Sequence, residues 1–306
     1  MKPRLALLAL AAAAPLAAEH YYLTVTGLAG EPDFGQRFSM WARDIEKSLK
    51  AASGARVETL EAPTREALRA ALAKIGRQAA PQDALVVMLI GHGTYDGADY
   101  RFNLPGPDIT AIDLAALLDR VPAARQLVVN MTSASGGSID ALRKENRVLV
   151  TATKSGSEKN ATVFARYWVE ALRDPAVDAD KNDTISALEA FRFAGQKTAA
   201  YFETQKRLAT EHALLEDTGK GEGVRVPSAE NGEGLLAGAF PLLRLGAAAA
   251  ALDDPAKRAL LARKEDLEQR IDQLKYRKAA LPLDAYKEQL AALLLELART
   301  QEELER

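Results

Sequence analysis

Three runs rich in apolar residues constrain the fold of this chain more than any other feature. They span residues 84–90, 126–130 and 148–153. Strands that are apolar along their whole length are typical of a sheet covered on both faces. Segments with helical spacing separate the runs, and alternation of strands with helices implies a mostly parallel sheet with helices on both of its faces. The sequence therefore predicts an α/β domain.

The remaining expected elements fit the same plan. A first strand, rich in β-forming residues, is expected at 21–26, and a last strand is expected within 235–245. Helical spacing of apolar residues predicts helices at 34–51, 64–75, 112–118 and 161–172.

The composition excludes several classes of protein. Among 306 residues there is no cysteine, which excludes a disulfide framework, a thiolate metal site and a thiol nucleophile. Lys plus Arg number 40 and Asp plus Glu number 42, and no stretch interleaves basic with aromatic residues. This balance gives no indication of a nucleic-acid partner.

The first 18 residues have the pattern of a secretory signal peptide. Lys2 and Arg4 precede an unbroken apolar run at 5–14, and a cleavage region, Pro15-Leu16-Ala17-Ala18, follows, in which Leu16 departs from the small residue preferred three positions before the cut. The run is too short to cross a bilayer about 30 Å thick. No later segment reaches 18 consecutive apolar residues. We therefore expect cleavage after Ala18, a mature chain that is periplasmic or secreted, and no membrane span.

Two neighbouring core strands are followed by polar, glycine-rich loops. The first loop carries His92 and Gly93, and the second spans 132–137 and contains Ser133. Ligands of open α/β sheets gather beyond the carboxyl ends of the strands. A glycine lets the backbone approach a ligand closely and leaves an N–H group, such as that of Gly93, free to bind a developing oxyanion.

The two loops together resemble the caspase–legumain–gingipain clan of cysteine peptidases. The sequence Leu-Ile-Gly-His-Gly ends at Gly93, and Asn-Met-Thr-Ser-Ala-Ser-Gly-Gly follows about 40 residues later. In that clan one core strand ends in His-Gly and the next ends in a cysteine shortly before Ser-Gly, which places Ser133 at the cysteine position. Residues 148–158 resemble the clan's next strand, which borders the pocket for a substrate side chain.

This resemblance covers roughly residues 21–223 and implies a caspase-like three-layer sandwich. It also implies His92, Ser133 and Gly93 as the catalytic positions and a protein or peptide as the ligand. A serine hydroxyl, unlike a thiol, needs an aligned base and usually an orienting acid. We therefore expect a catalytically impaired member of this fold. The alternative is an active serine-dependent peptidase or esterase in which Asp96 or Asp99 orients His92.

Residues 178–189 fit the twelve-residue loop of an EF-hand. Its oxygen ligands would be, in order, Asp178, Asp180, Asn182, Thr184 through its carbonyl, Ser186 and Glu189. Asp183 stands where glycine normally makes the sharp turn, and Asp tolerates positive φ better than most residues. We expect calcium binding here; the alternative is an acidic helix-capping loop. Polar residues at 210–212 and 216–217 are expected on the solvated surface.

The C-terminal part has a different pattern. Asp254-Pro255 is a helix start signal, after which leucines recur every seven residues, at 260, 267, 274 and 281 and, beyond Pro282, at 283, 290, 297 and 304. Such repeats predict a helical hairpin or a coiled-coil contact with a second chain, hence a homodimer. The alternative is that both helices simply pack on the domain. The expected boundaries are 19–246 for the α/β domain and 247–306 for the helical part.

Overall fold

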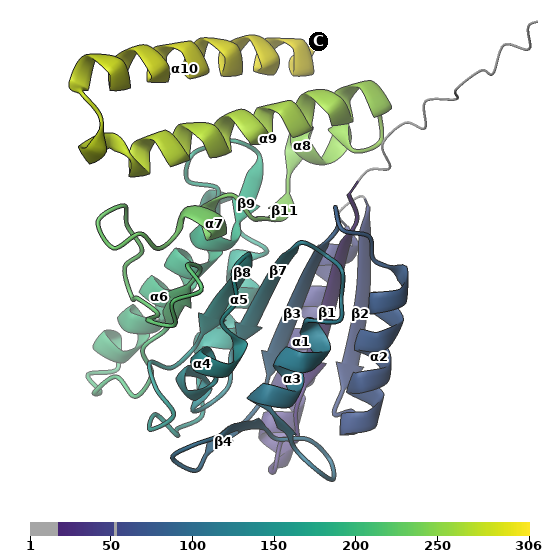
Figure 1. The fold of residues 1–306 in the computed structure, drawn as a ribbon. Helices are drawn as coiled ribbons and strands as arrows, with labels where there is room; N and C mark the ends of the chain where they lie inside the picture. Colours follow the sequence, from purple (N-terminus) through teal and green to yellow (C-terminus); the bar gives the residue numbers. More distant parts are fainter. Residues whose placement is uncertain (1–17, 52–53) are drawn as a thin grey trace, which may run out of the picture.

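A computed structural model describes residues 18–51 and 54–306, so all but the last residue of the expected signal peptide lies outside the described residues. Figure 1 shows a central sheet with helices on both sides. In spatial order its strands are β10 (Leu214–Glu216), β8 (Arg147–Thr151), β7 (Arg125–Asn130), β3 (Ala84–Ile90), β1 (His20–Thr26) and β2 (Ala55–Glu61). Only β10 runs antiparallel to its neighbour among these six strands. The predicted mostly parallel sheet is confirmed.

Two hydrophobic layers enclose the sheet, one on each face. The helices of the first layer are α1 (Pro32–Lys50), α5 (Phe164–Ala171) and α6 (Ala187–Thr204), and those of the second are α2 (Arg65–Gln78), α3 (Ala111–Leu118) and α4 (Ile139–Leu142). Strand β3 shows why its run is apolar at every position. Val86 and Met88 pack into the first layer, whereas Leu85 and Val87 pack into the second. The three-layer α/β architecture is thereby confirmed.

Edge strand β2 was not predicted. Its residues are half-buried or exposed and alternate in polarity, as in Arg56-Val57-Glu58, so no apolar run marks it. It pairs in parallel with β1, and this pairing places β1 in the interior of the sheet.

A small antiparallel sheet follows β3 directly. It consists of β4 (Gly93–Tyr95), β5 (Tyr100–Phe102) and β6 (Ile109–Thr110). Figure 1 shows β4 beyond the carboxyl ends of the parallel strands, at the lower edge of the view. This small sheet therefore covers the polar loops that were predicted to contain the functional residues.

The region after the α/β core forms a separate group of elements. It contains α7 (Leu235–Gly238), β11 (Pro241–Arg244), α8 (Gly246–Ala251), α9 (Pro255–Tyr276) and α10 (Leu283–Glu305). The strand predicted within 235–245 is thus correct for its second half, while the first half is helical. Strand β11 pairs with β9 (Thr184–Ser186), outside the main sheet.

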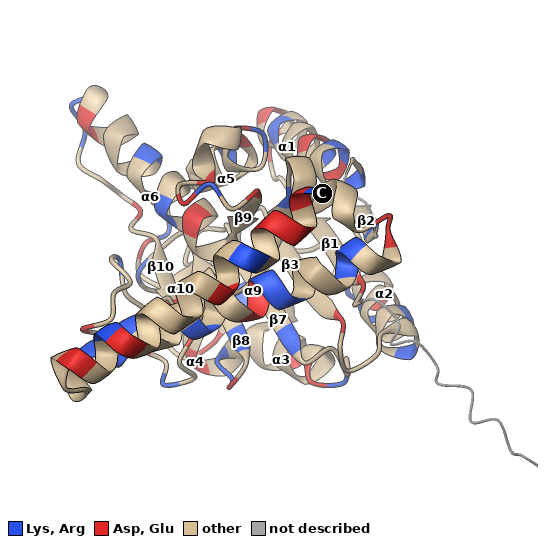
Figure 2. Cartoon of the chain, turned by 90° about the horizontal axis from the view of Figure 1, so that it is seen from above, with Lys and Arg blue, Asp and Glu red and all other residues tan. Residues whose placement is uncertain are grey.

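Helices α9 and α10 lie side by side and antiparallel (Figures 1 and 2). Asp254 caps α9 by accepting a hydrogen bond of 2.8 Å from the Ala256 N–H. Among the repeated leucines, Leu267, Leu274 and Leu304 are buried. Figure 1 shows α9 facing the α/β domain and α10 on the far side of α9. No helix within the described part of the chain is both long and apolar enough to cross a membrane.

Candidate functional site

Ser133 and Gly93 meet at the carboxyl ends of β7 and β3. The Gly93 N–H donates a hydrogen bond of 3.1 Å to Ser133 Oγ, and the Ser133 hydroxyl lies 3.2 Å from the Gly93 carbonyl oxygen, to which it donates. Ser133 is only 2% exposed. The hydroxyl that the resemblance places at the nucleophile position is therefore buried and bonded to backbone.

Only glycine fits at position 93. A Cβ atom there would lie 2.5 Å from the Ser133 carbonyl oxygen and 2.5 Å from the ring of Tyr100. Such distances are shorter than any van der Waals contact, and both neighbours are held in place. Tyr100 is itself buried and its hydroxyl bonds to the side chains of Asn130 and Thr132. The His-Gly motif thus lets β4 pass directly over the Ser133 loop.

The residue after Ser133 has a strained backbone. Ala134 has a φ of 56°, in the left-handed region that residues with a Cβ rarely adopt. Its N–H donates a hydrogen bond of 2.7 Å to the Glu158 carbonyl, which ties the turn to the loop after β8. Strain of this kind costs on the order of 1–3 kcal/mol and clusters at functional sites.

The His92 ring faces helix α1. Its centroid lies 4.7 Å from that of Phe34 and 5.4 Å from that of Phe38, both in edge-on geometry, and the ring hydrogen-bonds to the Ala29 backbone. Burial lowers the pKa of His92 and outweighs the opposing effect of that hydrogen bond. Within the described residues no hydrogen bond joins the ring to Ser133. The ring packs against Phe34 and Phe38 of α1 instead.

Neither acid expected to orient His92 does so. Asp96 accepts hydrogen bonds from the N–H groups of Ala98 and Asp99 and forms an ion pair of 2.6 Å with Arg101. The backbone hydrogen bond from Asp99, followed by Arg101, holds the pKa of Asp96 well below its usual range. Asp99 lies 3.7 Å from the same guanidinium. Both carboxylates stabilise the β4–β5 turn, and the aligned acid that a serine mechanism needs is not supplied by either.

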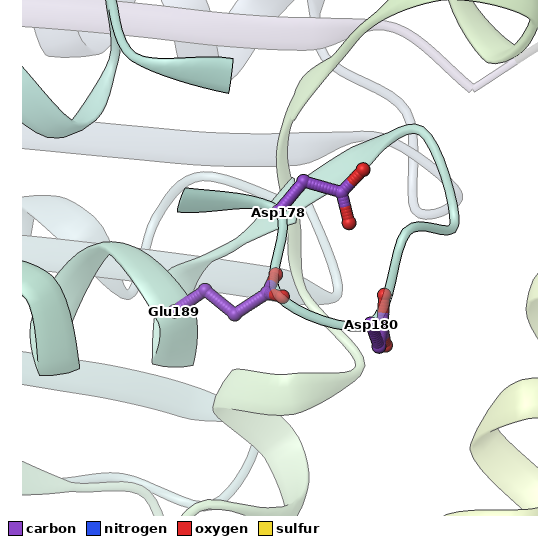
Figure 3. Close-up of side chains that lie close together, drawn as sticks. All are labelled: Asp178, Asp180 and Glu189. Carbon is purple, nitrogen blue, oxygen red and sulfur yellow. The ribbon is translucent and has the colours of Figure 1, made fainter. Parts of the chain in front are cut away.

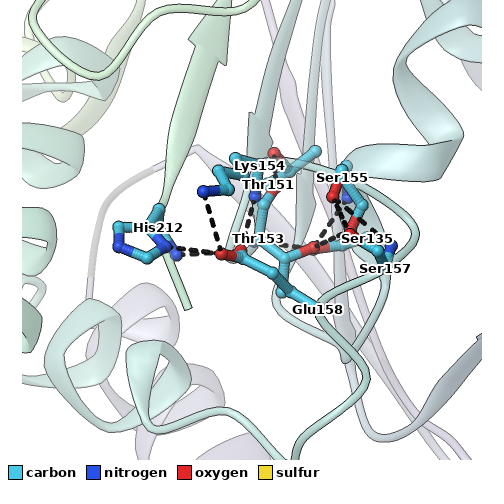
Figure 4. A network of polar contacts seen from close by, with 9 residues as sticks. Ser135, Thr151, Thr153, Lys154, Ser155, Ser157, Glu158 and His212 are labelled. Carbon is cyan, nitrogen blue, oxygen red and sulfur yellow. Dashed lines mark hydrogen bonds and ion pairs between the residues drawn. The ribbon is translucent and has the colours of Figure 1, made fainter. Parts of the chain in front are cut away.

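The loops after β7 and β8 are joined by a polar network (Figure 4). Ser135 Oγ accepts a hydrogen bond of 3.1 Å from the Thr153 N–H, and the Thr153 hydroxyl accepts one of 2.9 Å from the Gly136 N–H. Further along, Glu158 accepts hydrogen bonds from the N–H groups of Lys154 and His212. These bonds fix the backbone of the loop after β8.

Residues 210–212 and 216–217 were expected on the surface, and this prediction was wrong for Glu211, Glu216 and Asp217, which are buried, while His212 is half-buried. Glu211 is 4% exposed and accepts hydrogen bonds of 2.8 and 3.2 Å from the N–H groups of Val163 and Phe164, at the start of α5. Burial raises the pKa of Glu211 to about 7. The His212 ring bonds through Nδ1 to Glu158. Neither residue belongs to an apolar pattern, so nothing local in the sequence marks it as buried.

The small sheet covers these loops through one aromatic side chain. Tyr95 lies against two glycines: a Cβ atom would meet its ring at 2.7 Å from Gly137 and at 2.2 Å from Gly156. The ring therefore lies between the loops after β7 and β8, and the small sheet packs against both loops.

The predicted calcium loop brings three carboxylates together. Asp178, Asp180 and Glu189 each offer an oxygen atom, and these atoms lie within 4.8 Å of one another (Figure 3). Asp178 follows a short 3-10 turn (Pro175–Val177), and Glu189 lies in the first turn of α6. Oxygen-only donors at this spacing match the preference of calcium.

The other predicted ligands organise the loop. The Asn182 side-chain oxygen accepts a hydrogen bond of 2.9 Å from the Thr184 N–H, and Thr184 begins β9. Ser186 and Glu189 form a capping box at the start of α6. Asp183 has a φ of 64°, the positive value expected where an EF-hand normally has glycine. Glu189 therefore belongs both to the capping box and to the carboxylate cluster.

Electrostatic crowding marks the cluster as suited to a cation. Burial, followed by the charge of Glu189, raises the pKa of Asp180 to about 6. A divalent cation would remove this repulsion by accepting electron density from all three carboxylates. The residues present therefore fit calcium.

The two candidate sites lie at opposite ends of the central sheet. Figure 1 shows β9 and α9 beyond the amino ends of the parallel strands, whereas β4 lies beyond their carboxyl ends.

No protein-family model matches this chain, and no curated protein matches it in sequence. Among solved structures it is similar to the Drosophila initiator caspase Dronc, at 10% identity and a TM-score of 0.45, over 67% of this chain and 81% of that chain. It is similar to caspase-1 from Spodoptera frugiperda at 13% identity and a TM-score of 0.46, over 66% and 87%. A protein from Geobacter sulfurreducens shows 12% identity and a TM-score of 0.45, over 66% and 94%. These likenesses concern the fold alone.

Proposed function

We propose that this protein is an exported, calcium-binding domain of the caspase–legumain type that binds a protein or peptide segment without cleaving it efficiently. The observation that carries the proposal is the pairing of Ser133 Oγ with both backbone groups of Gly93. A hydroxyl engaged in this way, with the His92 ring held by Phe34 and Phe38, lacks the base that would take its proton.

The rate argument points the same way. Removing the nucleophile or base of an acyl-transfer site costs on the order of a million-fold in rate. A serine that replaces a cysteine without an aligned base suffers a loss of similar kind, since its proton has no acceptor as strong as an imidazole. Binding needs no such alignment, and the loops after β7 and β8 remain ordered by their hydrogen bonds.

A peptide is the ligand that this end of the sheet suits. The loop after β8 presents the exposed side chain of Lys154 beside Ser155 and Ser157. These side chains offer hydrogen-bonding groups to an extended chain. The resemblance of 148–158 to the strand that borders the substrate pocket of the clan supports the same assignment.

The competing function is a serine-dependent peptidase or esterase using Ser133 and His92. One observation favours it: the strained φ of 56° at Ala134 immediately follows the serine, as backbone strain often does at a nucleophile. In this alternative the His92 ring would leave α1 and turn to Ser133 when substrate binds.

Turnover and labelling separate the two functions. Purified protein is assayed against peptide libraries and simple esters, with and without calcium, and is treated with a fluorophosphonate probe. We expect negligible turnover and no labelling, while Ser133→Cys gains thiol-dependent cleavage because the Gly93 side of the site is retained. Labelling that is lost in both Ser133→Ala and His92→Ala would overturn the proposal in favour of the hydrolase.

Export is the remaining part of the proposal and rests on the sequence pattern at 1–18. N-terminal sequencing of protein recovered outside the cytoplasm should begin near Glu19, and a mature chain that retains Met1 would contradict it. Calcium in an exocytoplasmic compartment is plentiful, so a single loop of millimolar affinity suffices there.

A further inference from the structure

Two glycines from different loops form a bare backbone surface under Tyr95. Gly137 lies in the turn after β7 and Gly156 in the loop after β8, and a Cβ atom on Gly137 would lie 3.2 Å from the Cα atom of Gly156. The two glycines are therefore adjacent, and both face the Tyr95 ring. We call Gly137 and Gly156 the glycine platform.

The ring, and not the backbone, requires glycine at these two positions. Neither Gly137 nor Gly156 has a positive φ, so a residue with a Cβ atom could adopt either backbone conformation. A Cβ atom would instead collide with the ring of Tyr95, at 2.7 Å from Gly137 and at 2.2 Å from Gly156. The platform is therefore a surface shaped for a planar ring.

Tyr95 is held on the platform by packing alone. Its hydroxyl donates a hydrogen bond of 3.0 Å to the carbonyl of Gly97, which belongs to the same β4–β5 hairpin. Within the part of the chain that the structure describes, no hydrogen bond or ion pair joins residues 94–99 to the loops after β7 and β8. The ring can therefore leave the platform without breaking a polar contact to either loop.

The hairpin is fixed at its base and exposed at its tip. At the base, the Gly93 N–H bonds to Ser133, and the buried Tyr100 bonds through its hydroxyl to Asn130. At the tip, residues 96–98 are exposed. A movement of the tip would therefore uncover the platform while the hydrogen bonds at the base stay in place.

Polar side chains lie beside the platform in the chain. Lys154 is exposed, and Ser155 and Ser157, on either side of Gly156, share a hydrogen bond of 2.7 Å between their hydroxyl oxygens (Figure 4). A peptide that crosses this loop would find hydrogen-bonding groups for its backbone next to a surface for one side chain. An aromatic ring buries a large apolar area and lies flat against bare backbone.

We infer that the glycine platform binds an aromatic side chain of a peptide ligand, and that Tyr95 covers the platform until such a ligand displaces its ring. This inference rests on the proposed peptide binding and names the side chain that the ligand must carry. Because the binding-competent state is the one in which the tip has moved, Tyr95 lowers the affinity of the native chain by the fraction of molecules in that state.

Removal of the Tyr95 ring tests the platform as a binding site. The probe is N-acetyl-L-phenylalaninamide, measured by titration calorimetry. Tyr95→Ala should bind it about tenfold or more tightly than the native chain does, and neither protein should bind N-acetyl-L-alaninamide. Tyr95→Ala combined with Gly156→Ala should lose the gain, because the new methyl group occupies the place of the ring. Tyr286→Ala, at a half-exposed position on α10, should bind as the native chain does.

Two results of this titration overturn the inference. Equal affinity of the native chain and Tyr95→Ala would show that Tyr95 covers no binding site, and a gain that survives Gly156→Ala would place the probe elsewhere. Both results are independent of turnover and labelling at Ser133, so failure of this inference is distinct from failure of the proposed function.

Displacement is tested on the native chain, without any substitution. Nitration with tetranitromethane modifies exposed tyrosine rings, and mass spectrometry locates the product. An excess of N-acetyl-L-phenylalaninamide should increase nitration of Tyr95 several-fold and leave that of Tyr286 unchanged, whereas N-acetyl-L-alaninamide should change neither. Nitration of Tyr95 that is unaffected or reduced by the aromatic probe overturns the displacement.

Discussion

The Lys264 ammonium on α9 donates a hydrogen bond of 2.6 Å to the backbone carbonyl of Asn182, which lies within the predicted calcium loop. Lys264 is 6% exposed and lies 3.8 Å from Glu268, and Glu268 in turn accepts a hydrogen bond of 3.3 Å from the Asn182 side chain. Asn182 therefore bonds to α9 through both its backbone carbonyl and its side chain. These two hydrogen bonds attach the loop to the C-terminal hairpin.

Lys264→Met should lower the free energy of unfolding by about 2 kcal/mol, because it removes a buried charge-assisted hydrogen bond and leaves Glu268 without its cation. Urea unfolding followed by circular dichroism measures the loss. Arg263→Met is the matched control, since its ion pair with Glu296 is 53% exposed on the arginine side and should cost less than about 1 kcal/mol. Equal losses in the two variants would show that Lys264 has no special role.

Glu189→Gln should weaken calcium binding about tenfold or more, because it removes one of the three clustered negative charges. Glutamine is accepted at this position of a capping box, so the start of α6 should be retained. Titration calorimetry measures the affinity, and Glu203→Gln, at an exposed position near the end of the same helix, should bind as the native chain does. Absence of any calcium heat from the native protein at millimolar calcium would remove the proposed site.

Gly156→Ala should lower the free energy of unfolding by about 1–3 kcal/mol, because the new methyl group would lie 2.2 Å from the Tyr95 ring. Combining it with Tyr95→Ala should recover part of that loss, and a double-mutant cycle measures the coupling. The control is Gly195→Ala in α6, where a Cβ meets no atom within 4 Å and alanine should stabilise the helix by about 1 kcal/mol. If the losses of unfolding free energy from the two substitutions simply add, the contact between Tyr95 and the loop after β8 does not contribute to stability.

Glu211→Gln should flatten the pH dependence of stability. The folded-state pKa is raised to about 7 from an ordinary value of 4.5, so between these values the folded protein holds more protons than the unfolded chain. The native free energy of unfolding therefore falls as the pH rises through this window, by up to about 3 kcal/mol from this group. Urea titrations at pH 4.5 and 7.5 give the difference, which Glu211→Gln should reduce. An unchanged difference would contradict the assignment.

The sheet was predictable where its strands are buried on both faces. The run at 84–90 became β3 with its predicted bounds, since only apolar side chains can occupy both layers. Strand β2 escaped prediction because an edge strand is held by its backbone hydrogen bonds to β1 and needs no apolar pattern. The small sheet of β4, β5 and β6 was not predicted because its strands are only two or three residues long, too short to show a pattern.

The sequence indicated which loops contain the candidate sites, but it did not indicate how the side chains in those loops are arranged. The resemblance of the two loops to the peptidase clan indicated Gly93 and Ser133, and the structure brings them into hydrogen-bond contact. The direction of the His92 ring depends on Phe34 and Phe38, whose packing against it follows from the placement of α1 in three dimensions. Glu211 was misplaced on the surface because its partners are backbone N–H groups, which leave no trace in the pattern of side chains.

The pairing of β9 with β11 has a consequence for the order of synthesis. Strand β9 ends at Ser186, but its partner begins only at Pro241, so the ribosome must add residues 187–240 before the two can meet. The predicted calcium loop is therefore completed after every strand of the main sheet has been made. A chain interrupted before Pro241 would carry the three crowded carboxylates on an unpaired segment.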